Sequence, residues 1–194
     1  MVEGPGCTHN GQKVRASLLG RRVCGVAGSA SSTVANAIRG RTLVDSITLG
    51  KQLWLIFAGV EAVHGESAVR CHFGMNGSLH CNSKAPAQQG ARTAAGSLTL
   101  LIRFVGGDEV RICQATASLA DAQAARRAVT VACNRDVCSA SFDEDAAVAA
   151  LAAVRADRMV SDALLDQSVL AGVGNIIKNE ALHAVCVDPR RPIG

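Results

Sequence analysis

The chain has 194 residues, of which 48% are hydrophobic and 19% charged, and its formal net charge is +4. This length suffices for one substantial core or two small domains, and the apolar content excludes an intrinsically disordered chain. Neither a run of 18 apolar residues nor a basic-then-apolar leader occurs, which indicates a soluble, unsecreted protein without a membrane partner. The modest positive charge permits nucleic-acid binding but does not by itself predict it.

The first 114 residues carry short apolar runs separated by turn residues, a pattern that predicts strands. These runs cover residues 12–18, 43–48, 52–58, 68–73, 98–104 and 109–113. Gly106-Gly107-Asp108 lies between the last two runs and is typical of a hairpin turn. Residues 25–40 and 82–97 are rich in small and polar side chains, so we expect loops there. Together these features predict a two-layer β-sandwich.

Helical patterns follow from residue 141 onwards. Ser141-Phe142-Asp143-Glu144 is a capping-box signature, and the alanine-rich residues 145–154 continue that helix. Two further helices are expected at about residues 157–165 and 175–185, before prolines end regular structure. We therefore predict an α+β fold with a β-sandwich domain at residues 1–140 and a helical domain at residues 141–194.

Cysteine and histidine spacing gives no sign of a metal site. The eight cysteines are scattered without a Cys-x-x-Cys pair, and the five histidines lack the spacing of metal ligands. We therefore expect reduced, largely buried thiols and no metal. Aromatic residues make up 3% of the chain and tyrosine is absent, which argues against extensive base stacking of the kind used by single-strand-binding proteins.

The most informative segment is residues 166–180, which read DQSVLAGVGNIIKNE. An apolar helical pattern breaks at Gly172-Val173-Gly174 and restarts at Asn175. Glycines permit close backbone approach, and the first turn of a helix offers unpaired amides that can seat a phosphate. Asn175 adds a side-chain donor. A dinucleotide fingerprint is a rival interpretation, although the third glycine is missing and a helix precedes the turn. A helical hairpin without a ligand is the other alternative.

This segment resembles the helix–two-turn–helix signature of the formamidopyrimidine-DNA glycosylase / endonuclease VIII family. The Asp-Gln before the glycines and the Asn-Glu-Ala-Leu after them fit as well. The chain's opening, Val2 to Cys7, is similar to that of the third vertebrate endonuclease VIII-like paralogue. The resemblance implies that Asn175 binds a DNA phosphate, that residues 1–140 are catalytic and that residues 141–194 form a partial helix–two-turn–helix DNA-binding domain. It also implies a helix near residues 3–8, although Gly4, Pro5 and Gly6 disfavour a regular one.

The resemblance assigns the chemistry to Val2 and Glu3. Val2 is small enough for us to expect removal of Met1, which would expose an α-amine with a reference pKa of about 7.7–8.0. Such an amine is partly unprotonated near neutral pH and can form a Schiff base with a damaged nucleotide's sugar. Glu3 would move protons during base loss and strand cleavage. Without the family match, these two residues would be taken for a frayed terminus.

Two further matches assign DNA contacts to Lys51 and Met75. Lys51 lies at the entry to a buried strand, where the family has a phosphate-binding lysine; the alternative is an ordinary solvated lysine. Met75 lies in the His-Phe-Gly-Met-Asn-Gly turn, and its family counterpart fills the hole left by the extruded nucleotide; the alternative is core packing. The arginine and aromatic that usually assist it are missing from residues 113–118, which favours single-stranded DNA.

The implied function is a bifunctional DNA glycosylase with abasic-site lyase activity that excises oxidised bases, needs no cofactor, acts as a monomer and works in the nucleus. A catalytically impaired module that binds lesions or single strands is the main alternative. A structural ribosome-associated protein is a third. Family members continue with more helices and usually a finger, so we expect the 194 residues to be a fragment or a short member with an exposed apolar face, weakened DNA affinity and inefficient catalysis.

Overall fold

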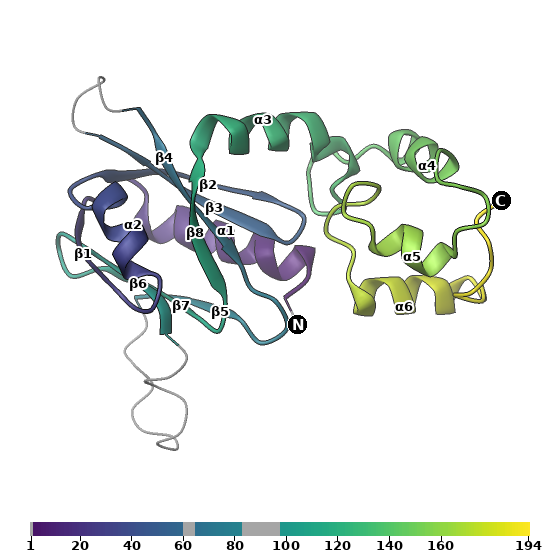
Figure 1. Cartoon of the computed structure of the whole chain (residues 1–194), viewed down its shortest axis with the longest axis horizontal. Helices are drawn as coiled ribbons and strands as arrows, with labels where there is room; N and C mark the ends of the chain where they lie inside the picture. The colour runs from purple at the N-terminus through teal and green to yellow at the C-terminus, as the bar shows by residue number, and fades with distance from the viewer. Residues whose placement is uncertain (1, 60–64, 83–97) are drawn as a thin grey trace, which may run out of the picture.

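The computed structural model describes residues 2–59, 65–82 and 98–194, and its described strands form two antiparallel four-stranded sheets. The first sheet has the order β2 (Thr42–Leu49), β3 (Gln52–Ala58), β4 (Ser67–His72) and β8 (Thr116–Asp121). The second has the order β1 (Val23–Ala27), β6 (Leu98–Phe104), β7 (Glu109–Cys113) and β5 (Ser78–Cys81). The sheets face each other, and the C-terminal helices lie beside them (Figure 1). The predicted α+β class and β-sandwich are confirmed.

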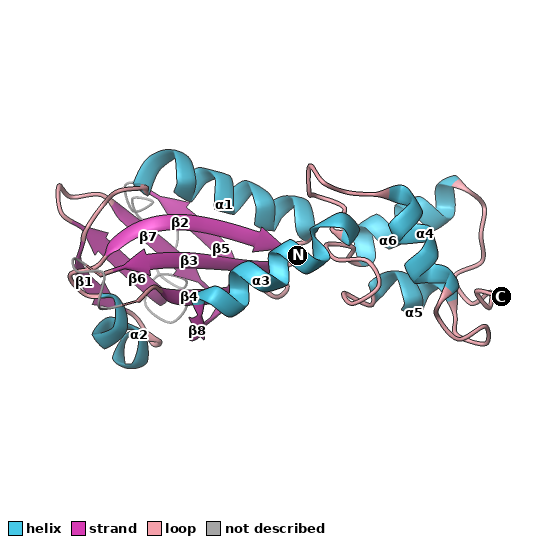
Figure 2. Cartoon of the chain, turned by 90° about the horizontal axis from the view of Figure 1, so that it is seen from above, coloured by secondary structure: helices cyan, strands magenta, loops and turns pink. Residues whose placement is uncertain are grey.

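Helices close the two open sides of the sandwich. Helix α1 (Gly4–Leu18) contacts β2 and β5, the edge strands on one side, and α2 (Ser31–Ile38) contacts β1 and β8 on the other. Helix α3 (Ala122–Ala132) lies across the outer face of the first sheet, and the view from above shows α1 and α3 running along the strands (Figure 2). The N-terminal end of α1 lies against the C-terminal helices.

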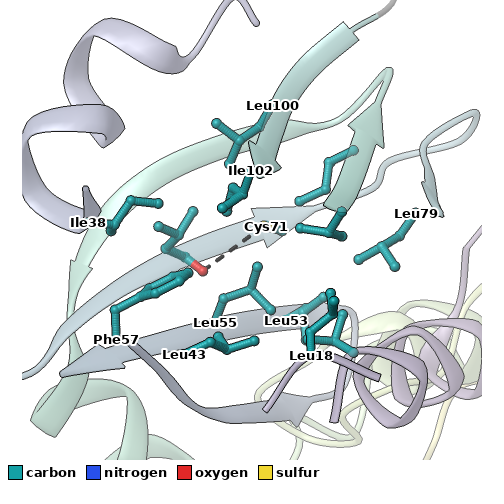
Figure 3. Close-up of a cluster of buried hydrophobic side chains, with 14 of the residues drawn as sticks. Leu18, Ile38, Leu43, Leu53, Leu55, Phe57, Cys71, Leu79, Leu100 and Ile102 are labelled. Carbon is teal, nitrogen blue, oxygen red and sulfur yellow. Dashed lines mark hydrogen bonds between the residues drawn. The ribbon is translucent and has the colours of Figure 1, made fainter. Parts of the chain in front are cut away.

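Strand β3 is buried on both faces, which explains its unbroken apolar run. Leu53, Leu55 and Phe57 belong to the core between the sheets (Figure 3), whereas Trp54 and Ile56 pack under α3. The strand therefore joins the two apolar layers of this domain. Its prediction at residues 52–58 is confirmed, as are the strands at 98–104 and 109–113 and the hairpin between them.

Two predictions for the first half of the chain were wrong. Residues 12–18, predicted as a strand, are the second half of α1, because Cys7, Val14 and Leu18 recur at helical spacing on its buried face. Residues 25–40, predicted as a loop, contain the end of β1 and all of α2, whose Val34 and Ile38 are buried. The other predicted loop, at 82–97, lies almost wholly outside the described residues. Helix α3 and strands β5 and β8 had not been predicted.

The C-terminal part is helical, with a short 3-10 turn η1 (Cys133–Arg135), α4 (Glu144–Ala152), α5 (Val160–Leu165) and α6 (Asn175–Ala184). The capping box was wrong in detail: Asp143, not Ser141, caps α4, and its carboxylate accepts from the Ala146 amide at 3.1 Å. The division at residue 140 stays a prediction. Among the described helices, none has the length and apolar character needed to cross a bilayer.

Phe57 offers a test of the core. Phe57→Ala should lower the free energy of unfolding by about 3–5 kcal/mol, because the removed ring is fully buried among both sheets. Chemical denaturation followed by circular dichroism measures the change. Val131→Ala, at a side chain that is 74% exposed on α3, is the control and should stay within about 0.5 kcal/mol of wild type. Equal effects would contradict the assignment of the core.

Candidate active site

Glu3 is seated on the N-terminus of α6. Its Oε1 accepts from the Ile176 amide at 2.7 Å and its Oε2 from the Ile177 amide at 3.1 Å, and the residue is only 7% exposed. A carboxylate is favoured there because it pairs amides that lack intrahelical partners and faces the positive end of the helix dipole. This contact fixes the start of α1 against the start of α6.

The same contact corrects one sequence interpretation. The first-turn amides of α6 were expected to seat a phosphate, but those of Ile176 and Ile177 are occupied by Glu3. Gly174 makes room for this carboxylate, since a Cβ on Gly174 would overlap the Glu3 side chain. The Ile176 and Ile177 amides are therefore not open to a phosphate.

Two glycines hold the backbones of α1 and the turn before α6 together. The Gly4 amide donates to the Gly172 carbonyl at 2.9 Å, and a Cβ on Gly4 would lie 2.7 Å from Gly172 Cα. Gly172 has φ +93°, a conformation that favours glycine. In the Gly172-Val173-Gly174 run, Gly172 thus makes the backbone contact with Gly4, and Gly174 leaves room for the Glu3 side chain.

Gln167 shapes the turn that carries these glycines. Its Nε2 donates to the carbonyls of Leu165 and Val173, both at 2.9 Å, and its Oε1 accepts from the Gly172 amide at 3.1 Å. In the sequence, the Asp-Gln pair is only part of the family resemblance and carries no role of its own. The structure shows that Gln167 satisfies three backbone groups of the turn and so holds its shape.

Lys51 lies close enough to Glu3 for the two charges to interact. Partial burial lowers the pKa of Lys51, and the nearby Glu3 carboxylate opposes that shift. The preceding Gly50 has φ +54°, and a Cβ there would lie 2.8 Å from the Gly172 amide nitrogen. The turn between β2 and β3 is thus packed against the same glycine turn as α1.

The backbone of Val2 contacts the turn after β4, which carries Met75. The Val2 amide nitrogen lies 3.4 Å from the Gly74 carbonyl oxygen, to which it donates, and Gly77 closes the turn through a 2.8 Å bond to the Phe73 carbonyl. Met75 is 68% exposed. The core-packing alternative for Met75 is therefore wrong, and its side chain is available to a ligand.

Asn175 begins α6 and is exposed on its first turn. Its Oδ1 accepts from Lys178 Nζ at 3.2 Å. Because the side-chain oxygen Oδ1 of Asn175 accepts from a cation, its side-chain nitrogen Nδ2 remains to donate to another group. Lys178, which had not been predicted, places a positive charge beside this donor.

The structure thus brings the start of α1, the Lys51 turn, the Met75 turn and the start of α6 to one junction, where Glu3 interacts with both Lys51 and α6. The roles assigned to these residues stay predictions. Within the described residues there is no group of three or more His, Cys, Asp or Glu side chains that could hold a metal ion.

Comparison with known proteins places this arrangement. The formamidopyrimidine-DNA glycosylase H2TH domain matches residues 134–193. Endonuclease 8-like 3 of Mus musculus is 34% identical over 206 residues, covering 94% of this chain and 33% of the relative. Formamidopyrimidine-DNA glycosylase of Salinispora arenicola is 34% identical over 165 residues, covering 81% of this chain and 52% of the relative. The chain therefore spans about a third of the endonuclease 8-like 3 relatives it matches.

Solved structures show the same fold. A viral DNA glycosylase superposes with a TM-score of 0.82 at 17% identity, covering 99% of this chain and 73% of that one. Lactococcus lactis Fpg in complex with DNA containing an abasic site gives a TM-score of 0.74 at 17% identity, covering 98% and 69%. Taken with the sequence relatives, these matches show that the chain belongs to the formamidopyrimidine-DNA glycosylase / endonuclease VIII family.

Gly174 tests the seat of Glu3. Gly174→Ala should displace the Glu3 carboxylate from α6 and lower the free energy of unfolding by about 1–2 kcal/mol, as loss of a helix cap does. Glu3→Ala should cost a similar amount, and the double variant little more than either, because both changes remove one interaction. Urea denaturation measures all three. Gly65→Ala, where a Cβ meets nothing within 4 Å, is the control. Additive losses in the double variant would contradict the contact.

Asp166 gives a pH-dependent test. Hydrogen bonds from the Ser168 side chain and amide, followed by Arg158, lower the pKa of Asp166 from its ordinary value of 3.8 to about 2. Because the folded pKa is depressed, the stabilisation is present above about pH 4 and is lost as the pH falls toward 2. Asp166→Asn should therefore cost about 1–2 kcal/mol at pH 7 and almost nothing near pH 2. Unfolding measured across this range checks it, with Asp145→Asn as control; a pH-independent difference would contradict the ion pair.

Proposed function

We propose that this chain is the catalytic part of a DNA glycosylase with abasic-site lyase activity, in which the α-amine of Val2 is the nucleophile. The observation that carries the proposal is the seating of Glu3 on the start of α6. It holds residue 2 between the Met75 turn and the helix that begins with Asn175. The similarity in sequence to an endonuclease 8-like 3 and to a formamidopyrimidine-DNA glycosylase supports the DNA glycosylase activity.

The proposed reaction begins after removal of Met1, a residue outside the described part of the chain. The unprotonated Val2 amine attacks C1′ of the damaged nucleotide, the bond from C1′ to the base breaks, and the base leaves with a proton. The sugar ring then opens as its ring oxygen takes up a proton, which leaves a Schiff base between Val2 and C1′. Loss of a C2′ proton expels the 3′ phosphate by β-elimination.

Glu3 is suited to carry these protons because it is adjacent in sequence to the nucleophile and its charge acts on that of Lys51. General acid–base catalysis of this kind requires a group within hydrogen-bond reach of the reacting atoms. The two α6 amides fix the Glu3 side chain, so its carboxylate is positioned before the substrate arrives.

Lys51 and the Asn175–Lys178 pair are proposed to bind phosphates on either side of the extruded nucleotide. Lys51 and Lys178 are cations, and Asn175 adds a side-chain donor beside Lys178. Among the contacts described for these residues, the one carboxylate is that of Glu3, which acts on Lys51. Met75 is proposed to fill the vacated space, since its long apolar side chain is exposed at the same junction.

A preference for single-stranded DNA forms part of the proposal. The segment between β7 and β8 offers only small side chains besides Gln114, and the Ala115 backbone is tied to Thr99 Oγ1 at 2.9 and 3.1 Å. With Met75 as a wedge and neither an arginine nor an aromatic residue at 113–118 to assist it, the enzyme would hold an intact duplex open poorly. We further propose that it acts as a monomer in the nucleus, where such a substrate occurs.

Activity on defined DNA tests the proposal. The purified chain should cleave single-stranded DNA that carries an oxidised pyrimidine, more efficiently than the matched duplex. Glu3→Gln should lower the cleavage rate by about 100-fold or more, the typical contribution of a general acid–base group. Lys13→Ala, on the middle of α1 and away from the junction, is the control and should cleave as wild type. DNA binding without product would favour the alternative of a non-catalytic binding module.

A further inference from the structure

Asp136 is a buried carboxylate that the proposed chemistry does not use. It is only 3% exposed, and its described partners are backbone amides rather than cations. Its Oδ2 accepts from Gly50 N at 2.7 Å and its Oδ1 from Cys138 N at 3.0 Å. A buried charge costs free energy unless its hydrogen bonds are satisfied, so moving either the Gly50 or the Cys138 amide away from Asp136 would destabilise the fold.

The Gly50 amide belongs to the turn that carries Lys51. Leu49 pairs with Gln52 across strands β2 and β3, so Gly50 and Lys51 form a two-residue hairpin loop. A positive φ at Gly50 and none recorded at Lys51 is the type II′ pattern. The amide of the first loop residue is not part of the strand pairing, and Asp136 supplies the partner it needs.

Asp136 also touches the glycine turn before α6. A parallel bridge joins Asp136 to Ala171, and the Val137 amide donates to the Ala171 carbonyl at 3.1 Å. A Cβ on Gly172 would lie 3.2 Å from Asp136 Oδ1. One carboxylate therefore connects the Lys51 turn to the turn on which α1 packs.

We propose that Asp136 is a positioning residue for Lys51. Its carboxylate clamps the Gly50 amide against the Ala171–Gly172 turn, and this holds the Lys51 side chain in its partly buried place and toward the DNA phosphate. The phosphate-binding part rests on the proposed function, whereas the placement of Lys51 does not. Asp136→Asn should release the turn, because one carboxylate oxygen becomes an amide group that faces a backbone donor instead of accepting from it.

Two readouts separate these parts. The first is the pKa of Lys51, followed by NMR on protein with isotopically labelled lysine. In wild type, burial lowers this pKa; in Asp136→Asn it should rise toward the ordinary lysine value as the side chain enters water. Amide hydrogen exchange at Gly50 should accelerate in the same variant. Asp45→Asn, a carboxylate bonded to Arg15 and Arg126 elsewhere on the sheet, is the matched control and should change neither quantity.

The second readout is affinity for single-stranded DNA with a reduced abasic site. Asp136→Asn should weaken binding about as much as Lys51→Ala, by up to about tenfold. The double variant Asp136→Asn/Lys51→Ala should bind no more weakly than Lys51→Ala alone. If Asp136→Asn does not fold, Asp136→Ser, which is smaller and whose hydroxyl can accept from a backbone amide without pointing an NH2 group at it, takes its place in every measurement.

The outcomes are distinguishable. An unchanged Lys51 pKa and unchanged Gly50 exchange overturn the role of Asp136, whatever happens to DNA binding. A raised Lys51 pKa with unchanged DNA affinity supports the positioning role and overturns the phosphate-binding role of Lys51. Losses of affinity that add fully in the double variant show that Asp136 acts on binding by a route other than Lys51, and also overturn the inference.

Discussion

The structure depends on the close approach of two backbones that are far apart in sequence. The Gly4 amide donates to the Gly172 carbonyl at a point where a Cβ on Gly4 would clash with Gly172 and where Gly172 has φ +93°, and Glu3 then reaches the first amides of α6. This junction connects the β-sandwich to the C-terminal helices. It also places residue 2. Because Glu3 and Gly4 are held against α6 and the turn before it, the preceding Val2 lies at the boundary between the sandwich and the C-terminal helices.

Electrostatics at this junction follows from the occupied helix end. The positive end of α6 is neutralised by Glu3, so it does not act as an open anion site. In the proposed function, attraction for DNA comes instead from the side chains of Lys51 and of the Asn175–Lys178 pair. Lys178 stands in the first turn of a helix, where a cation is disfavoured by the helix dipole. The Glu3 carboxylate at the same helix end offsets this effect for Lys178.

Much of the sandwich could be predicted because the local sequence of its strands matches their structure. The run from Leu53 to Phe57 is apolar throughout, and Gly106-Gly107 marks the hairpin between β6 and β7. Residue patterns alone did not predict helix α1, because Gly4, Pro5 and Gly6 have poor helix propensity and tertiary contacts override it. The family resemblance did imply a helix near residues 3–8, and the start of α1 confirms it. Helix α3 had a signal that was overlooked, since Asp121 caps it through the Gln123 and Ala124 amides.

The site shows the same division between local and distant information. Glycines and an asparagine at the start of α6 could be recognised from a short motif. The contact between Glu3 and Ile176 spans 173 residues, and no periodicity or composition encodes such a pairing; only resemblance to a family suggested that the two ends meet. Asp136 and Lys178 escaped notice because a single acidic or basic residue carries no sequence signal until its neighbours in space are known.

In the proposed function, the junction presents the amine of residue 2 to a sugar carbon. Borohydride reduction during reaction with damaged single-stranded DNA, followed by proteolysis and mass spectrometry, identifies the residue that carries the trapped sugar. The account predicts that the modification lies on the α-amine of Val2 in protein lacking Met1. A sugar attached to Lys51, or turnover by protein that retains Met1, would contradict it.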